Sequence, residues 1–185
     1  CHGGADAQGL APFDFSTTSN ACGPCPPVVA AITGVDALHY PDPLNTALRS
    51  RLAAFHSVSP DRVLVTASGS EAIARLTATC VRGGARTVAV PPRAYGDYGA
   101  AAQAWGLRVV QWGDHTAEAV DLGWVCDPDS PVGAACEPPP AGAAQVLALD
   151  RAYAPLRLAG PDPWPVAALA RVWQVWSPHK ALGLT

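Results

Sequence analysis

Two ionisable side chains follow apolar runs in this sequence, where they could take part in chemistry. Asp150 ends the run "QVLALD" (145–150), and Lys180 follows the run "RVWQVW" (171–176) within "SPHKALG". A carboxylate after an apolar run is costly to bury without a partner, which could be a nearby arginine or a protonated ring nitrogen. A lysine beside apolar residues can form a Schiff base, although a solvated surface amine has the same local sequence.

A run of small residues could bind a phosphate group. The predicted strand "RVLVT" (62–66) leads into "ASGSEAIARL" (67–76), so that Ser68 to Ser70 lie near a helix N-terminus. Free N–H groups and the helix dipole favour an anion there, although an ordinary capped helix has the same pattern. With an aromatic from "PPRAYGDY" (91–98), the aspartate and the lysine, this run supplies what a pyridoxal phosphate site needs.

The sequence Cys22-Gly23-Pro24-Cys25 has the spacing of a redox-active disulfide. A redox pair of this kind is expected after a buried strand, with its first cysteine at a helix N-terminus. Here the pair follows the polar stretch "DFSTTSNA" (14–21) and precedes two prolines, so we interpret it as a turn. No second cysteine or histidine pair completes four zinc ligands, and we predict no metal site.

The composition limits the possible functions. The chain has 185 residues, 49% of them hydrophobic, which predicts one globular domain or a large part of one. The net charge of −3 gives no electrostatic case for binding nucleic acid or an anionic membrane. No apolar run approaches the roughly 18 residues of a membrane span, and no signal peptide is evident, so we expect a cytoplasmic protein.

Predicted strands alternate with predicted helices along the chain. This pattern predicts an α/β fold with a largely parallel sheet. Besides 62–66, the expected strands are 87–91, 107–112, 123–128, 145–150 and 171–176. The expected helices are 28–38, a segment around 44–55, 70–82, 95–106 and 165–170, with a loop at 137–143.

An ordered set of motifs resembles the class I/II aminotransferases, which are fold-type I pyridoxal-phosphate enzymes. The branch it most resembles contains histidinol-phosphate aminotransferase and threonine-phosphate decarboxylase. The motifs are "HGG" (2–4), "DFSTTSNACGP" (14–24), "HYPDP" (39–43), "LVTASGSEAI" (64–73), "PPRAYGDY" (91–98), "CDPDSPVG" (126–133), "DRAY" (150–153) and "SPHKALGLT" (177–185). The resemblance implies a three-layer α/β/α large domain with a mostly parallel central sheet.

The resemblance also implies roles around the cofactor ring. Lys180 would form the Schiff base with pyridoxal 5'-phosphate and carry protons at the substrate carbon. Asp150 would keep the pyridine nitrogen protonated, Tyr153 would hydrogen-bond the phenolic oxygen, and Tyr95 would stack on the ring. Ser130 stands where the family usually has an asparagine that helps to hold this oxygen.

Further roles concern the phosphate and the substrate. Gly69, Ser70 and Glu71 would form the phosphate-binding loop, joined by Ser177. Tyr40 would reach the cofactor phosphate of a neighbouring subunit, which implies a homodimer. Two further residues, Asn20 and Gly23, fit a family loop that covers a small-molecule amino-acid substrate, and His179 replaces a usual serine.

We expect residues 1–43 to form an N-terminal arm and substrate and dimer segment, and 44–185 to form the cofactor-binding large domain. The chain begins with Cys1 and stops five residues after Lys180, so we expect a partial chain that lacks a C-terminal small domain. The reaction implied is transamination of a small phosphorylated amino acid. Threonine-phosphate decarboxylation in cobalamin biosynthesis is the close alternative, and a thiol redox protein is a distant one.

Overall fold

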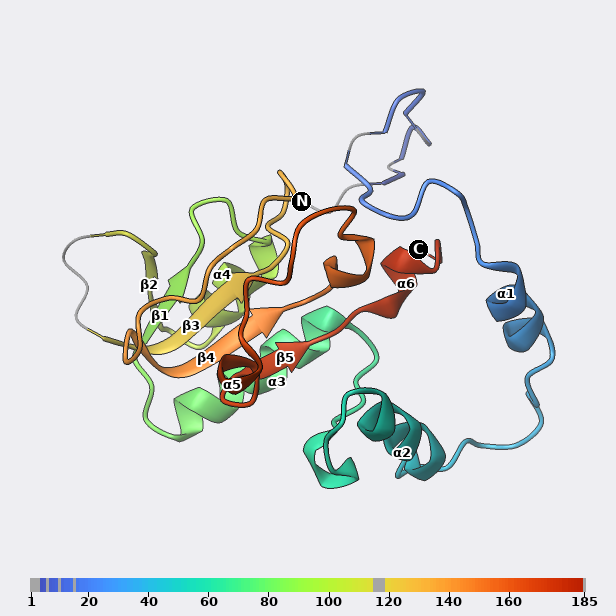
Figure 1. Cartoon of the computed structure of the whole chain (residues 1–185), viewed down its shortest axis with the longest axis horizontal. Helices are drawn as coiled ribbons and strands as arrows, with labels where there is room; N and C mark the ends of the chain where they lie inside the picture. Colours follow the sequence, from blue (N-terminus) through green and yellow to red (C-terminus); the bar gives the residue numbers. More distant parts are fainter. Residues whose placement is uncertain (1–3, 6, 10, 15, 115–118, 185) are drawn as a thin grey trace.

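The computed structural model describes residues 4, 5, 7–9, 11–14, 16–114 and 119–184. A five-stranded, entirely parallel sheet in the order β2-β1-β3-β4-β5 forms its centre (Figure 1). The strands are β1 (Thr87–Val90), β2 (Arg108–Gln111), β3 (Val120–Cys126), β4 (Ala144–Asp150) and β5 (Trp173–Val175). This confirms the predicted α/β class and parallel sheet.

The central strands β3 and β4 carry nearly continuous apolar sequence because both of their faces are covered. Register aligns Cys126 of β3 with Asp150 of β4, and Asp150 with Val175 of β5. The carboxyl ends of these three strands therefore lie side by side, with Asp150 in the middle.

Helices α3 (Gly69–Arg82) and α4 (Gly96–Ala104) cover one face of the sheet. Their main core contacts come from residues such as Ile73 and Tyr98, which pack with Leu122 and Trp124 of β3. The other face is covered by Trp164, by the one-turn helix α5 (Val166–Leu169) and by the β3–β4 connection. The predicted three layers are present, with the second helical layer reduced to α5.

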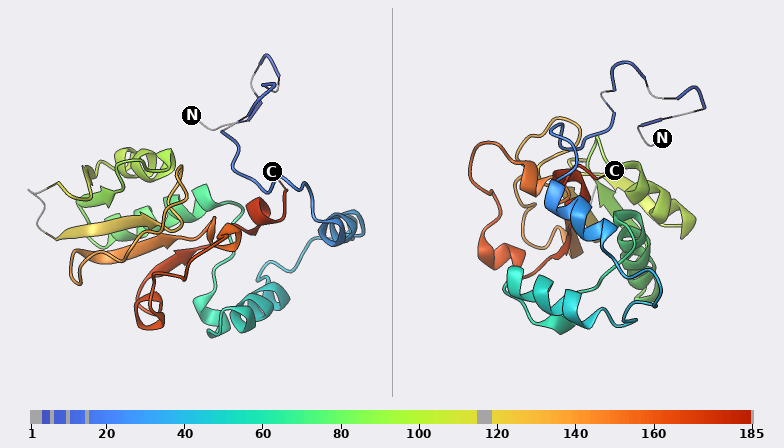
Figure 2. Two further views of the ribbon diagram at one scale, coloured as in Figure 1. Left: turned by 45° about the horizontal axis from the view of Figure 1, so that its top comes forward. Right: turned by 90° about the vertical axis from the view of Figure 1, so that its right-hand side faces the viewer.

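Two further helices, α1 (Pro26–Thr33) and α2 (Thr46–Phe55), lie beyond the end of the sheet (Figure 2). Ala53 is the first buried side chain along the described part of the chain. Helix α1 starts at Pro26 and ends at Thr33, shorter than the predicted 28–38, because Gly34 closes it. Among the described residues, no helix has both the length and the apolar character needed to cross a bilayer.

The predicted strand 62–66 is wrong. Residues Pro60–Arg62 form the short 3-10 helix η1, and the segment that follows pairs with no strand of the sheet. The carbonyl of Val63 accepts a 3.0 Å hydrogen bond from Nε of Arg49, and Leu64 is 63% exposed. Residues that favour strands do so because they pack well on a half-buried sheet. This segment lies beside no strand of the sheet, so that preference has no effect here.

The remaining predicted elements are confirmed within a few residues, including the loop 137–143. Two short helices, η2 (Ala154–Leu156) and α6 (Pro178–Ala181), were not predicted. His2 and Gly3 of the first motif, as well as Phe15 and Thr185, lie outside the described residues.

Candidate active site

Most of the residues expected to do chemistry gather at the carboxyl edge of the sheet. Because all five strands are parallel, the segments that follow β1, β3, β4 and β5 emerge at this edge. They contain Tyr95, Ser130, Tyr153 and Lys180 respectively. The topology therefore makes one site from segments that are distant in the sequence.

Asp150 is the most buried ionisable group among the predicted site residues, with 8% of its surface exposed. Its Oδ2 accepts a 2.7 Å hydrogen bond from the Tyr98 hydroxyl, and Oδ1 accepts a 2.9 Å bond from the N–H of Ala152. Arg151 pairs with Asp162 instead of Asp150. Burial raises the pKa of Asp150, and the two hydrogen bonds and the charge of Lys180 partly offset that rise.

Tyr98 is a site residue that sequence reasoning missed. Its side chain is fully buried, and its ring stacks on that of Trp124 with centroids 4.8 Å apart and planes 6° from parallel. The ring of Tyr95 meets the ring of Tyr98 edge-on, with centroids 5.8 Å apart. The spacing of Tyr95 and Tyr98 was the available signal, because residues three apart lie on one face of a helix.

Lys180 lies in the short helix α6, five residues after β5 ends at Val175. Helix α6 starts after Ser177 with Pro178 in its first turn, and proline is well suited to a first helical position. The ammonium group of Lys180 lies 5.3 Å from the centre of the Tyr153 ring and interacts with the charge of Asp150. The helix thus turns the lysine back towards the end of β4.

The N-terminus of α3 forms a small cradle with the residue before α6. Ser68 caps the helix by accepting a 3.1 Å hydrogen bond from the N–H of Glu71. The first-turn N–H groups of Gly69 and Ser70 have no acceptor within the helix. A side chain at Gly69 would contact Oγ of Ser177 at 3.4 Å, so these two segments are close together.

Two further contacts define this cradle. Oγ of Ser70 lies 3.4 Å from the Tyr95 hydroxyl, which joins α3 to α4. Glu71 is engaged within its own loop, because its carboxylate binds the N–H of Ala67 at 2.6 Å and pairs with Arg75. The groups that remain to face an anion are therefore the backbone of the first turn and the hydroxyls of Ser70 and Ser177.

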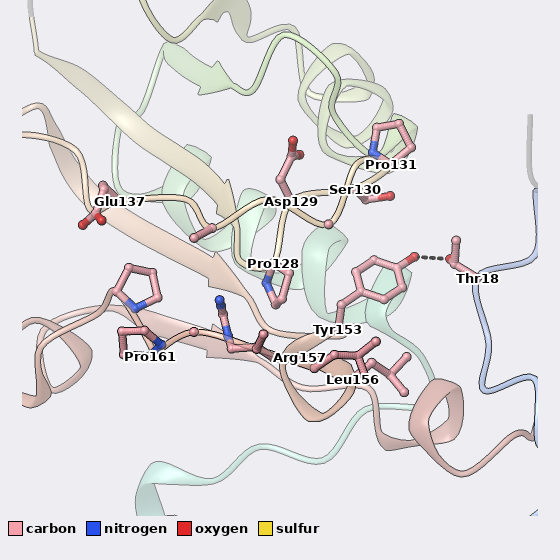
Figure 3. A pocket seen from close by; sticks show the side chains of 16 residues that line it. Thr18, Pro128, Asp129, Ser130, Pro131, Glu137, Tyr153, Leu156, Arg157 and Pro161 are labelled. Carbon is pink, nitrogen blue, oxygen red and sulfur yellow. Dashed lines mark hydrogen bonds between the residues drawn. The ribbon is translucent and has the colours of Figure 1, made fainter.

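A cavity of about 660 Å³ opens on one side of Tyr153 (Figure 3). Ser130 and Thr18 line it, and the Thr18 hydroxyl lies 2.6 Å from that of Tyr153. Arg157, on the cavity wall, makes a 2.6 Å ion pair with Asp127, whose side chain is fully buried. Tyr153 and Ser130 are the predicted site residues that line this cavity.

The N-terminal loop crosses the segment that carries the lysine. The N–H of Asn20 donates a 2.8 Å hydrogen bond to the carbonyl of Lys180, and its side-chain amide donates to the carbonyl of Ala181 at 3.0 Å. The N–H of Cys25 donates to Leu182 at 2.9 Å. Asn20 therefore lies beside the backbone of the lysine segment, and Gly23 lies close to Gly183 of the same segment.

The cysteine pair is not arranged as in a redox enzyme of the thioredoxin type. Cys25 is the residue that precedes α1, so the helix starts after the second cysteine and not after the first. Within the described ranges, no three His, Cys, Asp or Glu side chains gather as around a metal ion. Tyr40 is fully exposed on the connection between α1 and α2, and the structure does not bring it to the other predicted residues.

Comparison with protein-family models identifies the family of this chain. The model described as "Aminotransferase class I and II" matches residues 14–137, about two thirds of the chain. The chain is also similar to histidinol-phosphate aminotransferase 2 of Thiobacillus denitrificans, with 43% identity over 63 residues, covering 32% of this chain and 18% of that protein.

Comparison with solved structures supports the same fold. Histidinol-phosphate aminotransferase of Sinorhizobium meliloti, solved in complex with pyridoxal-5'-phosphate, matches 90% of this chain and 52% of its own with a TM-score of 0.70 and 23% identity. L-threonine-O-3-phosphate decarboxylase of Porphyromonas gingivalis matches 76% of this chain and 46% of its own, with a TM-score of 0.56 and 21% identity. The chain thus spans about half the length of these solved proteins.

Proposed function

Because this chain belongs to the aminotransferase class I and II family, we propose that it forms the cofactor-binding part of a pyridoxal-phosphate-dependent aminotransferase. The observation that carries the proposal is the position of a buried carboxylate, Asp150, at the carboxyl edge of the sheet, where it lies within the electrostatic influence of the Lys180 amine. A buried carboxylate is costly to maintain, and ionisable groups in such an environment cluster at functional sites. We propose a small phosphorylated amino acid as the substrate.

The donor set fits pyridoxal phosphate. A protonated ring nitrogen needs an ionised carboxylate. Burial raises the pKa of Asp150, and its two hydrogen bonds and the charge of Lys180 act against that rise by favouring the charged form. A phosphate needs N–H and hydroxyl donors, which the first turn of α3 and Ser177 supply. Tyr95, which lies on the α4 side between these two groups, offers an aromatic face for the ring.

Each residue then has a defined task in the proposed reaction. Bound pyridoxal phosphate supplies an electron sink that stabilises negative charge on the carbon next to the substrate amine. Asp150 would keep the ring nitrogen protonated, and the hydroxyl of Tyr153 would hold the phenolic oxygen, with Ser130 beside Tyr153 on the cavity wall. Lys180 would accept the proton that leaves the substrate carbon and donate a proton on the cofactor side of the substrate nitrogen. The loop of Asn20 and Gly23 covers the substrate and limits the access of water.

We further propose that the active form is a homodimer in which Tyr40 reaches the cofactor phosphate of a second copy. The full exposure of Tyr40, away from its own chain's site, supports this role. Residues 1–43 would then serve as the arm that contributes to substrate binding and to the dimer, and 44–185 as the cofactor-binding domain. Ala53 is the first buried side chain among the described residues, which agrees with an N-terminal arm that packs little on its own chain.

Threonine-phosphate decarboxylation is the second candidate. The sequence features that favour it are the motifs "HGG" (2–4), "DFS" (14–16) and "YPDP" (40–43). Transaminases and decarboxylases share the cofactor contacts, and they differ in which substrate bond is held perpendicular to the ring. Products distinguish them, because transamination transfers the amino group to an oxo acid whereas decarboxylation releases carbon dioxide and keeps the amine.

The test is to add pyridoxal phosphate to the wild-type chain and to Lys180→Ala, reduce with borohydride, and locate the adduct by peptide mass spectrometry. We expect a stable adduct on Lys180 in the wild type and none in the variant. Lys180 is the sole lysine in the sequence, so Lys180→Arg is a matched control that keeps the charge and removes the reactive amine. An unmodified wild-type chain, with the cofactor in excess, would contradict the proposal.

A further inference from the structure

The hydroxyl of Tyr98 and the carboxylate of Asp150 form a buried pair at the centre of the site. The oxygen atoms are 2.7 Å apart, Tyr98 is fully buried, and Asp150 is 8% exposed. Tyr98 therefore has no access to bulk water, and Asp150 has little. The contact joins α4 to the end of β4 across the core.

Packing fixes the orientation of Tyr98. Its ring stacks on Trp124, which is fully buried in the middle of β3, and it meets the edge of Tyr95. A tyrosine held between two aromatic rings has few alternative rotamers, so its hydroxyl is aimed at one point. That point is Oδ2 of Asp150.

We infer that Tyr98 is a positioning residue that acts through Asp150, holding the carboxylate ionised and fixed in the orientation in which it meets the ring nitrogen of the cofactor. The inference rests on the proposed function for the identity of the ring. The pair itself rests on the contacts described. Tyr98 has no direct contact with the cofactor in this assignment, and its removal should change the behaviour of Asp150.

The ionisable groups around Asp150 come from three elements of the fold. Tyr98 and Tyr95 face it from the start of α4, Cys126 from the end of β3, and Lys180 from α6. Burial raises the pKa values of Tyr98 and Cys126.

The effect of the hydroxyl on stability has a defined sign. The folded pKa of Asp150 lies above its ordinary value, so its contribution to stability is present below about pH 4 and is lost as pH rises through the folded pKa. Replacing Tyr98 by phenylalanine removes a donor to the charged form and raises that pKa further. The variant should therefore lose more stability relative to the wild type at neutral pH than at pH 3.

The first experiment measures urea unfolding of the wild type, Tyr98→Phe and Thr77→Val from pH 3 to pH 8, without cofactor. Thr77→Val is the matched control because Thr77 is a fully buried hydroxyl that bonds the carbonyl of Ile73 within α3. We expect the deficit of Tyr98→Phe to grow with pH and that of Thr77→Val to stay constant. A deficit of Tyr98→Phe that is the same at all pH values would overturn the inference.

The second experiment measures the dissociation constant of pyridoxal phosphate by tryptophan fluorescence at neutral pH. A hydrogen bond to a charged group corresponds to about a tenfold change in affinity, so we expect Tyr98→Phe to bind about 10-fold more weakly. Equal affinity in both proteins would overturn the inference while leaving the proposed function intact. If the wild type binds no cofactor, the proposed function fails, and the pH experiment still decides the Tyr98–Asp150 pair.

Should Tyr98→Phe fail to fold at neutral pH, Asp150→Asn and the double variant Tyr98→Phe/Asp150→Asn keep the inference testable. A folded double variant would show that the single variant fails because it leaves a buried charge without its donor, as we infer. A double variant that also fails to fold, in contrast to a folded Asp150→Asn, would show that the hydroxyl of Tyr98 acts in packing alone, which contradicts a role through Asp150.

Discussion

The N–H of Asn20 and the carbonyl of Lys180 are joined by a 2.8 Å hydrogen bond, although they lie near opposite ends of the chain. Gly183 makes the crossing possible. It has a φ of +65°, and a side chain there would overlap the carbonyl oxygen of Gly23. The N-terminal loop therefore holds the backbone around the lysine, and it depends on this close approach of two glycines.

Gly183→Ala is expected to disturb this crossing. The positive φ costs about 1 kcal/mol for a non-glycine residue, and displacement of the loop of Gly23 adds to it, so we expect a loss of more than about 2 kcal/mol in unfolding free energy. Hydrogen exchange at the N–H groups of Asn20 and Cys25 should become faster. The matched control is Gly142→Ala, which has a φ of +82° but no neighbouring atom within 4 Å. Equal losses in the two variants would contradict a role for the crossing.

Removal of Arg157 is expected to be strongly destabilising. Arg157→Met leaves Asp127 fully buried without its cation, a change that typically costs about 3–5 kcal/mol. The double variant Asp127→Asn/Arg157→Met should lose less, because the buried charge is gone and the amide oxygen can still accept from the N–H of Cys136. Urea unfolding of the wild type, the two single variants and the double variant measures these losses in unfolding free energy.

An exposed arginine provides the comparison for that cycle. Arg93 lies 3.8 Å from Asp129, and its side chain is 66% exposed, so Arg93→Met should change stability by less than about 1 kcal/mol. If Arg157→Met lost no more stability than Arg93→Met, the buried Asp127 carboxylate would not depend on Arg157, and the assignment would be contradicted.

Asp121 is expected to make the fold sensitive to acid. Its carboxylate accepts hydrogen bonds from the N–H groups of Arg86 and Thr87, from the Thr87 hydroxyl and from Gln145, which ties β1 and β4 to β3. These bonds lower its pKa. Its contribution is therefore present above about pH 4 and is lost as pH falls through the folded pKa.

Asp121→Asn should accordingly lose less unfolding free energy than the wild type as pH falls from 5 to 2. Asp114→Asn, which removes an exposed carboxylate in the turn after β2, is the control and should leave the acid limb as in the wild type. Thermal unfolding monitored by circular dichroism across this range measures both. Identical acid limbs for Asp121→Asn and the wild type would refute the assignment.

The cysteine pair is expected to be dispensable. Cys22 is exposed, and Cys25 supplies only backbone contacts at the start of α1. Cys22→Ser/Cys25→Ser should therefore change the unfolding free energy by less than about 0.5 kcal/mol and leave cofactor binding unchanged. The control Cys126→Ser places a hydroxyl in the core and should cost about 1–3 kcal/mol. Loss of cofactor binding in the double serine variant would favour the thiol alternative.

The local sequence predicted the elements that rely on local signals. Helix α3 has its capping serine and an apolar face, and β3 and β4 are apolar runs long enough to be central strands. The run 62–66 shows the limit of such prediction. Its residues favour a strand, but the partner it would need is supplied by tertiary structure, and none lies beside it.

The sequence by itself determined the α/β class, the family resemblance and the residue types of the candidate site, because motif spacing and hydrophobic periodicity are properties of the linear sequence. Only the tertiary structure decided which side chains meet. Parallel register brought Asp150 between Cys126 and Val175, and the packing of α4 aimed Tyr98 at its carboxylate. Contacts of this kind depend on the geometry of packed elements in three dimensions, and no local pattern in the sequence encodes them.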